Sequence, residues 1–148
     1  MRLSTKTRYG LASLVCMAES RAYDESVTVL SLSEKLKISK IYLEQVFSLL
    51  RRGGIVTSIK GAHGGYRLAR PPREITVCDV LTATETAFFE KTEETADGYG
   101  EHIERAMRET VFDALDNSVK SVLSGITLED IVNQAEKYQS GDNYMYYL

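Results

Sequence analysis

Ile41, Glu44 and Gln45 lie within five positions of one another in a segment whose spacing predicts a helix after Ser39. At about 100° per residue, these side chains point away from the apolar stripe of that helix. A glutamine amide matches adenine N6 and N7, a carboxylate accepts from cytosine N4, and an apolar side chain suits a thymine methyl group. This combination therefore predicts a helix that reads base edges in a DNA major groove. The alternative is an ordinary solvated helix face.

A glycine-rich, basic hairpin follows this helix. Two short alternating segments, Ile55 to Lys60 and Tyr66 to Ala69, predict paired strands, and the five residues between them, GAHGG, predict the tip. Glycines allow a backbone to approach a sugar-phosphate edge or a minor groove, and the cations supply charge. The alternative is a flexible hairpin of no special function. The residues assigned to DNA at the tip are Lys60, His63, Gly64 and Gly65.

Side chains that can contact phosphate surround both features. Hydroxyl, phenol, ammonium and guanidinium groups are typical phosphate contacts, and they position a protein on DNA without reading sequence. The residues assigned to this role are Arg2, Lys6, Arg8, Ser39, Tyr42, Arg51 and Arg52.

The charge of the chain is divided between its halves. Residues 1–73 hold 13 Lys and Arg against 5 Asp and Glu, whereas residues 74–148 hold 5 against 16, so the overall charge is only −3. A basic first half suits a polyanion, and an acidic second half is repelled by one. The alternative is a chance division of solvated surface charge.

Helix-capping residues predict the elements that position these side chains. Helices are expected after Ser4 (to about Glu19), Thr28 (29–36), Ser39 (to Gly53-Gly54), Thr76 (77–85) and Thr127, with a long helix over about 101–123. A short helix, a turn, a second helix and a hairpin form a winged helix-turn-helix. The expected fold is therefore mainly α with a small β-hairpin wing, and residues 1–73 and 74–148 are expected as a DNA-binding domain and a dimerisation region.

The long helix carries an apolar stripe that its own small chain has little means to cover. Pairing with a second copy is the simplest remedy. The stripe predicted from helical spacing consists of Ile103, Met107, Val111, Ala114, Ser118 and Val122. The acidic segment Phe88 to Gly100 is expected to be a loop, and the tail Gly141 to Leu148 is expected not to be helical.

Catalysis, metal binding and membrane insertion find little support. The two histidines, His63 and His102, form no recognised catalytic pattern, and no enzyme activity is expected. Cys16 and Cys78 have no metal-type spacing, so neither a metal site nor a cofactor is expected. A thiol sensor is one interpretation of these cysteines and inert burial is the other. No apolar run has the length of a membrane span and no signal-peptide core is found, so the cytoplasm is the expected location.

Three separated motifs, MRLSTKTRYGL, YLEQVFSLLRRGGIV and KGAHGGYRLAR, resemble the IscR and CymR group of winged-helix regulators, the Rrf2 family, and the resemblance continues through ITVCDVL and ITLEDIV. It implies a repressor that binds double-stranded DNA as a homodimer through the long helix. The recognition positions implied are Ser39, Tyr42, Glu44 and Gln45. The basic residue of the wing is implied at Lys60, where many members carry arginine, which is more cheaply desolvated in a narrow groove.

Iron-sulphur members of this family hold a cluster with three cysteines before the long helix. The segment Glu85 to Glu101 has none, so the chain is more similar to the branch without a cluster, which represses cysteine metabolism. That branch implies a partner, the cysteine synthase that uses O-acetylserine, which receives an aromatic C-terminal tail. The residues of this tail are Tyr144, Met145, Tyr146, Tyr147 and Leu148, with leucine where the branch usually ends in isoleucine. The alternative is a tail that packs on its own dimer.

Two competing hypotheses keep the same winged fold. One is a protein-interaction module that acts through its tail or acidic half. The other is a redox- or ligand-gated sensor, which differs from the repressor only in its trigger. The operator, the regulated genes and the inducing signal are not disclosed by the sequence.

Overall fold

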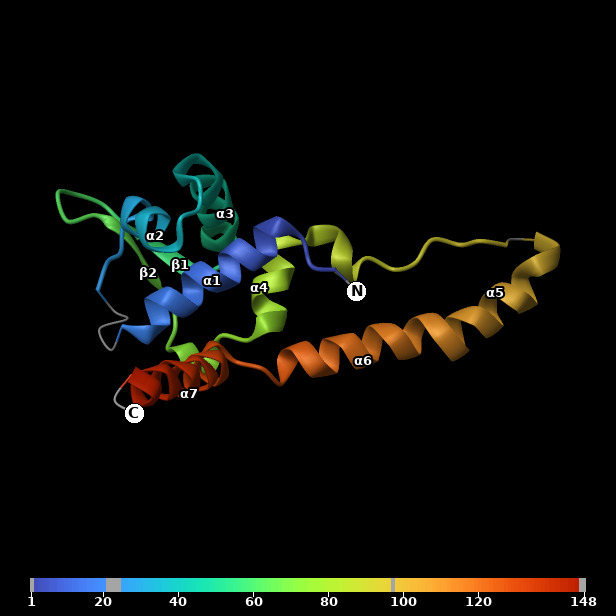
Figure 1. Ribbon diagram of the computed structural model, residues 1–148. Coiled ribbons are helices and arrows are strands. Elements are labelled where there is room, and N and C mark those ends of the chain that lie inside the picture. The colour runs from blue at the N-terminus through green and yellow to red at the C-terminus, as the bar shows by residue number, and fades with distance from the viewer. Residues whose placement is uncertain (1, 21–24, 97, 147–148) are drawn as a thin grey trace.

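The chain folds into helices around a two-stranded antiparallel sheet (Figure 1). The computed structural model describes residues 2–20, 25–96 and 98–146, although the side chains of residues 140–146 are not described. The elements are α1 (Thr5–Glu19), α2 (Val29–Leu36), α3 (Lys40–Arg52), β1 (Val56–Ile59), β2 (Gly65–Leu68), α4 (Val77–Thr84), α5 (Glu101–Met107), α6 (Asp113–Ser124) and α7 (Leu128–Tyr146). This arrangement confirms the expected fold class.

Hydroxyl side chains begin most of these helices at the predicted positions. Ser4, Thr28, Ser39, Thr76 and Thr127 each accept a hydrogen bond from the backbone N–H three residues further on, at 3.1 to 3.4 Å. Each bond satisfies one of the N–H groups that a helix start leaves without a partner. The start of each of these helices is therefore a property of the local sequence.

Helix α1 lies in the middle of the molecule and packs against α3, α4 and α7 (Figure 1). Leu14 and Ala18 are buried, whereas Leu11 and Val15, which helical spacing places on the same face, are half-buried. Met17 takes part of their place, with 2% of its surface exposed. Because α1 has neighbours on several sides, its buried face is wider than one stripe and is turned toward Thr7 and Gly10.

The hydrophobic core continues beyond the wing. Ile75 and Val80 from the α4 region, and Leu128 and Val132 from α7, belong to the same buried cluster as Phe47 of α3. The α4 and α7 helices therefore close the base of the winged domain. The division of the chain into two domains at residue 73 stays a prediction.

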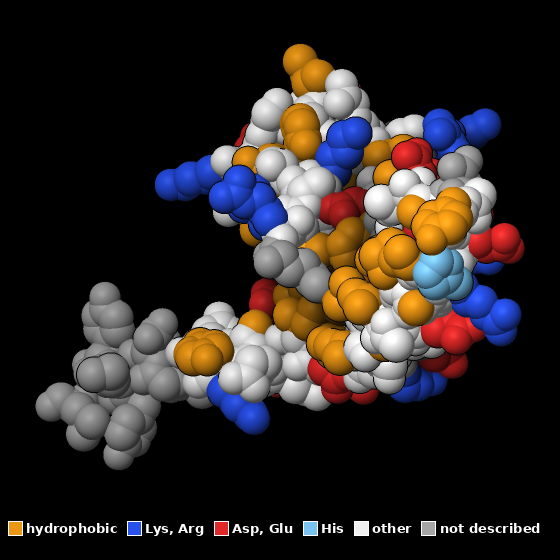
Figure 2. All heavy atoms as spheres, turned by 90° about the vertical axis from the view of Figure 1, so that its right-hand side faces the viewer, with side chains coloured by type: hydrophobic (Ala, Val, Ile, Leu, Met, Phe, Trp, Pro, Cys, Tyr) orange, Lys and Arg blue, Asp and Glu red, His pale blue; other side chains and the backbone are white. Residues whose placement is uncertain are grey.

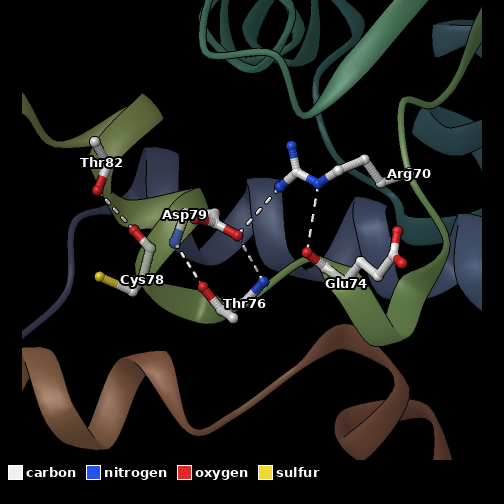
Figure 3. Close-up of polar contacts among 6 residues, drawn as sticks. All are labelled: Arg70, Glu74, Thr76, Cys78, Asp79 and Thr82. Carbon is white, nitrogen blue, oxygen red and sulfur yellow. Dashed lines mark hydrogen bonds and ion pairs between the residues drawn. The ribbon is translucent and has the colours of Figure 1, made fainter.

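The chain leaves the wing through a polar junction (Figure 3). The Arg70 guanidinium donates to Asp79 Oδ2 at 3.2 Å and to the Glu74 carbonyl at 3.4 Å. The same Asp79 oxygen accepts from the Thr76 backbone N–H at 3.0 Å, completing the capping box of α4. One carboxylate therefore both starts α4 and joins that helix to the end of the wing.

The C-terminal helix is longer than expected. Residues 141–146 continue α7, so the prediction of a non-helical tail was wrong. A glycine inside a helix costs only about 1 kcal/mol relative to alanine, and a helix already formed propagates more easily than one starts. Tyr144, Met145 and Tyr146 thus lie on α7, while Tyr147 and Leu148 fall outside the described residues.

The long helix forms an arm that runs away from α2, α3 and the wing (Figure 1). Helical structure extends without a break from Glu101 to Ser124, as predicted, but residues Arg108–Phe112 form a π-helical segment between α5 and α6. The segment before the arm is irregular except for 3₁₀ turns at Thr86–Phe89 and Gly98–Gly100, which agrees with the expected loop.

The wing pairs β1 with β2 from Val56 opposite Leu68 to Ile59 opposite Gly65, which leaves five residues in the tip. The start of β2 also pairs with Val27, whose backbone N–H and C=O form hydrogen bonds with those of Tyr66 at 2.7 and 2.8 Å. Gly65 makes this contact possible, because its φ is +154° and a Cβ there would lie 2.4 Å from the Val27 carbonyl oxygen.

We expect Gly65→Ala to lower the free energy of unfolding by more than the matched change Gly61→Ala. Both residues have positive φ, so each substitution carries backbone strain of about 1–3 kcal/mol, but a Cβ at Gly61 meets nothing within 4 Å. Only the change at Gly65 also disturbs the Val27–Tyr66 bonds. Urea titrations of the two variants measure the difference, and equal losses would contradict this role of Gly65.

Candidate nucleic-acid interface

Helix α3 is divided sharply into a buried and an exposed face. Leu43, Val46, Phe47 and Leu50 are 0% exposed, while Ile41 on the other side is 71% exposed. Glu44 and Gln45 are exposed next to Ile41. A shallow depression beside them is lined by Lys6, Ile41, Glu44, Gln45, Ser48 and Leu49. The structure therefore brings together the three side chains chosen for base reading and adds Lys6 of α1 to their edge.

The two predicted phosphate contacts at the start of α3 differ in their burial and in their neighbours. Ser39 is exposed and uses its oxygen as the cap, so its hydroxyl proton stays available to a phosphate. Tyr42 is half-buried and packs edge-to-face on Tyr9, with ring centroids 5.3 Å apart. Tyr42 therefore also joins α1 to α3, a role that the helical spacing does not reveal.

Glu44 forms an exposed ion pair with Lys40, with 3.7 Å between nitrogen and oxygen. Such i,i+4 pairs contribute only about 0.3–0.5 kcal/mol, so the carboxylate can leave its partner at little cost. Arg51 and Arg52 are exposed at the other end of α3, about 18 Å along the axis from Ser39. They lie apart from the residues chosen for base reading, at the end of the helix that was predicted to contact a phosphate.

The N-terminal cations stand at a firmly held helix start. Lys6 and Arg8 are exposed on α1, whereas Arg2 precedes that helix rather than lying on it. The Glu85 carboxylate accepts from the Ser4 backbone N–H at 2.6 Å and from the Thr7 hydroxyl at 2.9 Å. These bonds fix the start of α1 against the end of α4, and they position Lys6 beside α3.

The supporting residues of this anchor escaped the sequence analysis. Thr7 is fully buried and its hydroxyl lies 2.7 Å from that of Thr84, 77 positions away. Such a pair has no local signal, because it exists only when α1 and α4 pack together.

The wing is held through its second strand and through one backbone carbonyl of its tip. Tyr66 packs on Phe47 with ring centroids 5.0 Å apart, and the Ser26 hydroxyl donates to the His63 carbonyl at 2.6 Å. The side chains of Lys60 and His63 are exposed, so both side chains assigned to DNA at the tip face solvent. Gly64 has an internal reason to be glycine, since a Cβ would lie 2.6 Å from the Ile59 carbonyl oxygen.

The two cysteines lie on different helices, Cys16 on α1 and Cys78 on α4. Burial raises the pKa of the half-buried Cys16 thiol, outweighing the opposite effect of Lys35, while Glu19 raises that pKa further. Cys16 is therefore protonated at neutral pH, which argues against the sensor interpretation for this residue. Cys78 is also free and half-buried, at the second position of α4.

The comparisons with known proteins agree with this geometry. Residues 3–134 match the family model of Rrf2, described as an iron-dependent transcriptional regulator. This chain belongs to the Rrf2 family. It is 32% identical to the transcriptional regulator CymR of Bacillus subtilis over 148 residues, the whole of both chains. It is 43% identical to the regulator IscR of Cereibacter sphaeroides over 86 residues, which cover 57% of this chain and 56% of that one.

A solved structure leads to the same family. The structure titled CymR, the global cysteine regulator of B. subtilis, covers 90% of this chain and 98% of its own, with a TM-score of 0.70 and 33% identity. The Rrf2 relatives are transcriptional regulators rather than enzymes, as expected from the sequence. Among the helices described, none combines the length and the hydrophobicity that crossing a bilayer requires.

The iron in the family description has no fitting thiolate site in this Rrf2 member. Clusters need thiolate ligands, and the two cysteines lie on α1 and α4, away from the segment before the arm. Within the described residues, no three metal-binding side chains of the His, Cys, Asp or Glu type converge. The donor set therefore does not fit an iron-sulphur cluster, and DNA binding is derived below without one.

An internal carboxylate holds the segment before the arm instead. Glu104 is 6% exposed, and its Oε2 accepts from the backbone N–H groups of Thr95 and Ala96 at 2.9 and 3.0 Å. Its other oxygen has no hydrogen bond, but Arg108 lies 3.6 Å away and compensates its charge. Arg108 also reaches the Thr92 carbonyl at 3.5 Å. These contacts tie residues 92–96 to the arm.

We expect Glu85→Gln to remove a pH-dependent part of the stability. Burial tends to raise the pKa of Glu85, but the hydrogen bonds from Ser4 and Thr7 outweigh it and hold the pKa below its ordinary value of 4.5. The stabilisation is therefore complete above pH 4.5 and is lost as the pH falls through the lowered folded-state pKa. Urea titrations from pH 7 to pH 3 should show the gap between wild type and variant closing on acidification. A constant gap would contradict the anchor.

We expect Glu104→Ala to release residues 92–96 from the arm. Two backbone N–H groups lose their acceptor, and each such loss costs about 1–3 kcal/mol when the group stays buried. Amide hydrogen exchange at Thr95 and Ala96 should therefore accelerate, while exchange in α3 should not. Glu109→Ala removes an exposed carboxylate of the same helix and serves as the control. Unchanged exchange at Thr95 would refute the assignment.

Proposed function

We propose that this Rrf2-family regulator is a homodimeric repressor that binds double-stranded DNA through α3, the wing tip and the start of α1. One observation carries the proposal: the exposed polar face of α3 lies beside the exposed Lys6 of α1, and α3 also holds the wing, which carries the exposed Lys60. A major groove about 12 Å wide admits one helix, and the flanking cations then meet phosphates.

Base reading is assigned to the three side chains exposed on α3. Gln45 forms a bidentate pair with adenine, Glu44 accepts from cytosine N4, and Ile41 contacts a thymine methyl group. Ile41 is 71% exposed, which is unusual for an isoleucine. Its contact with water is unfavourable, and covering the side chain with DNA would remove that contact. Its exposure supports an apolar contact in the groove.

Phosphate contact is assigned to the basic rim. Arg2, Lys6, Arg8 and Ser39 lie at the α1 and α3 starts, and Arg51 and Arg52 lie at the end of α3. Lys60 and His63 extend the rim into the minor groove or along its edge. Neutralising about 6–10 phosphates per dimer would make the affinity fall steeply with salt, because each contact releases bound counterions.

The homodimer is assigned to the arm. Ile103, Val111, Leu115 and Val122 are 49%, 53%, 56% and 62% exposed along one helix. Hydrophobic side chains gather around a hollow beside the arm (Figure 2). Apolar patches of this kind on a protein usually mark an interface. Two copies joined through their arms would present two winged domains to a palindromic site.

The regulated genes are assigned by similarity. The B. subtilis relative is titled the global cysteine regulator, and we propose control of cysteine or sulfur metabolism for this chain as well. The partner implied for that branch is a cysteine synthase that uses O-acetylserine. Tyr144, Met145 and Tyr146 of the tail that would enter it lie at the end of α7.

We expect Gln45→Ala to lose discrimination at one base pair of each half-site, by about 1–3 kcal/mol, because the bidentate partner of one adenine disappears. The operator is first selected from random duplexes. Competition binding then compares wild type and variant on duplexes that differ at single base pairs. If the variant keeps both its affinity and its discrimination, Gln45 does not read the sequence.

Lys60→Ala is the matched contrast, since it removes a phosphate contact rather than a base contact. It should weaken binding to all duplexes alike and lower the slope of log affinity against log salt by about one per subunit. Failure of the wild-type protein to retain any duplex at low salt would refute DNA binding altogether and favour an interaction module.

A further inference from the structure

The arm contains an irregularity whose position has a geometric consequence. In residues Arg108–Phe112 the helix widens into a π-helical segment, and the backbone N–H of Asp113 donates to the carbonyl of Arg108, five residues earlier. Such a segment contains one residue more than the α-helix it interrupts. Insertions of this kind are rare and are frequent at functional sites.

The extra residue brings the apolar side chains of the arm into line. From Ile103 to Val122 the chain advances 19 positions, whereas five turns of α-helix take about 18. The π segment absorbs the one residue of difference, so both ends of the series point in the same direction. In an uninterrupted helix they would diverge by about 100°. The aligned side chains are Ile103, Met107, Val111, Leu115, Val119 and Val122.

This alignment changes the stripe predicted from the sequence. Uniform helical spacing selects Ala114 and Ser118, but the π segment turns α6 so that Leu115 and Val119 continue the line from Val111. Leu115 is 56% exposed, as expected for a member of an uncovered face. Val119 is half-buried because it also lines a pocket with Phe88 and Phe89.

The adjacent face of the arm is occupied by the chain itself. Glu104 and Arg108 hold residues 92–96, and further along Asp116 faces the pocket beside Phe88 and Phe89. The opposite flank carries small exposed side chains, Ala106, Thr110, Ala114 and Ser118. The apolar series, which we call the seam, is thus bordered on one side by its own chain and on the other by residues that permit close approach of a helix.

The apolar residues of the seam are spaced almost symmetrically about one point of the helix. About a point beside Phe112, Ile103 lies opposite Val122, Met107 opposite Val119, and Val111 opposite Leu115. A two-fold axis requires this property, because residue i of one copy must meet residue j of the other and the reverse. The symmetry identifies a second copy of the same helix, running antiparallel, as the occupant of the seam.

We propose that the π segment sets the register of this seam, so that two arms pair antiparallel about a two-fold axis near Phe112. The inference rests on the proposed homodimer and adds the device that aligns its interface. Ile103 of one subunit then meets Val122 of the partner subunit across the axis. Without the inserted residue, the two halves of the seam face different directions and only one can be covered.

Deletion of Thr110 tests the proposal, because it removes the inserted residue and returns the arm to uniform α-helix. Sedimentation equilibrium should show the dimer dissociation constant rising about 100-fold, since about half of the seam leaves the interface. Thr110→Ala keeps the length of the helix at the same position and should dimerise as the wild type does. Circular dichroism checks that each variant is folded.

A second pair of variants avoids any change of length. Leu115→Ala should weaken the dimer about tenfold, because a seam side chain is lost. Combining it with Ala114→Leu should not restore dimerisation, because position 114 lies on the flank of the seam. Restoration by Ala114→Leu would mean that uniform helical spacing governs the interface and would overturn the proposal.

The outcomes separate the two proposals. A wild-type protein that stays monomeric at high concentration refutes the homodimer and the seam together. A dimeric wild type with a folded Thr110 deletion that dimerises equally well refutes only the role of the π segment. A dimeric wild type with a monomeric deletion variant and a dimeric Thr110→Ala variant supports both.

Discussion

Leu43, Val46, Phe47 and Leu50 expose none of their surface, and the other elements of the winged domain meet on this face of α3. Val46 lies where α1 approaches closely, next to Gly10, and Phe47 receives Tyr66 from the wing. At the end of α3, Gly53 leaves room for Ala83 of α4, since a Cβ there would come within 2.5 Å of it. Because one face is held so completely, the opposite face has a defined orientation.

The same constraint gives the proposed DNA surface its rigidity. The side chains proposed to read bases stand on a helix that cannot rotate without opening the core. The wing is fixed to that helix through the contact of Tyr66 with Phe47, and its second strand also pairs with the backbone of Val27. The cations of α1 are held by Glu85 at the end of α4. A surface made from three separate segments therefore behaves as one body, which reduces the ordering cost of binding.

Part of the acidic half of the chain, the arm, lies away from this proposed surface (Figure 1). The arm holds five of the sixteen acidic residues of this half and runs away from α3 and the wing (Figure 1), and two of the five are paired with arginines of the same helix. The charge asymmetry of the sequence thus becomes a separation in space between a basic surface and an acidic support.

The local sequence alone determined the starts of the helices, the division of α3 into two faces, the stop at Gly53-Gly54 and the hairpin, because caps, helical period and turn residues act over a few positions. Packing between distant segments decided the rest. Thr7 with Thr84, Tyr9 with Tyr42, and Val27 with Tyr66 have no signal in the sequence, since each pair meets only after the helices assemble. The α7 extension and the π segment depend on whether a helix, once begun, continues, and local breakers such as Gly141 are overruled by the cooperativity of the helix. For that reason the spacing of the arm placed Ala114 in the seam, while the folded helix turned Leu115 there instead.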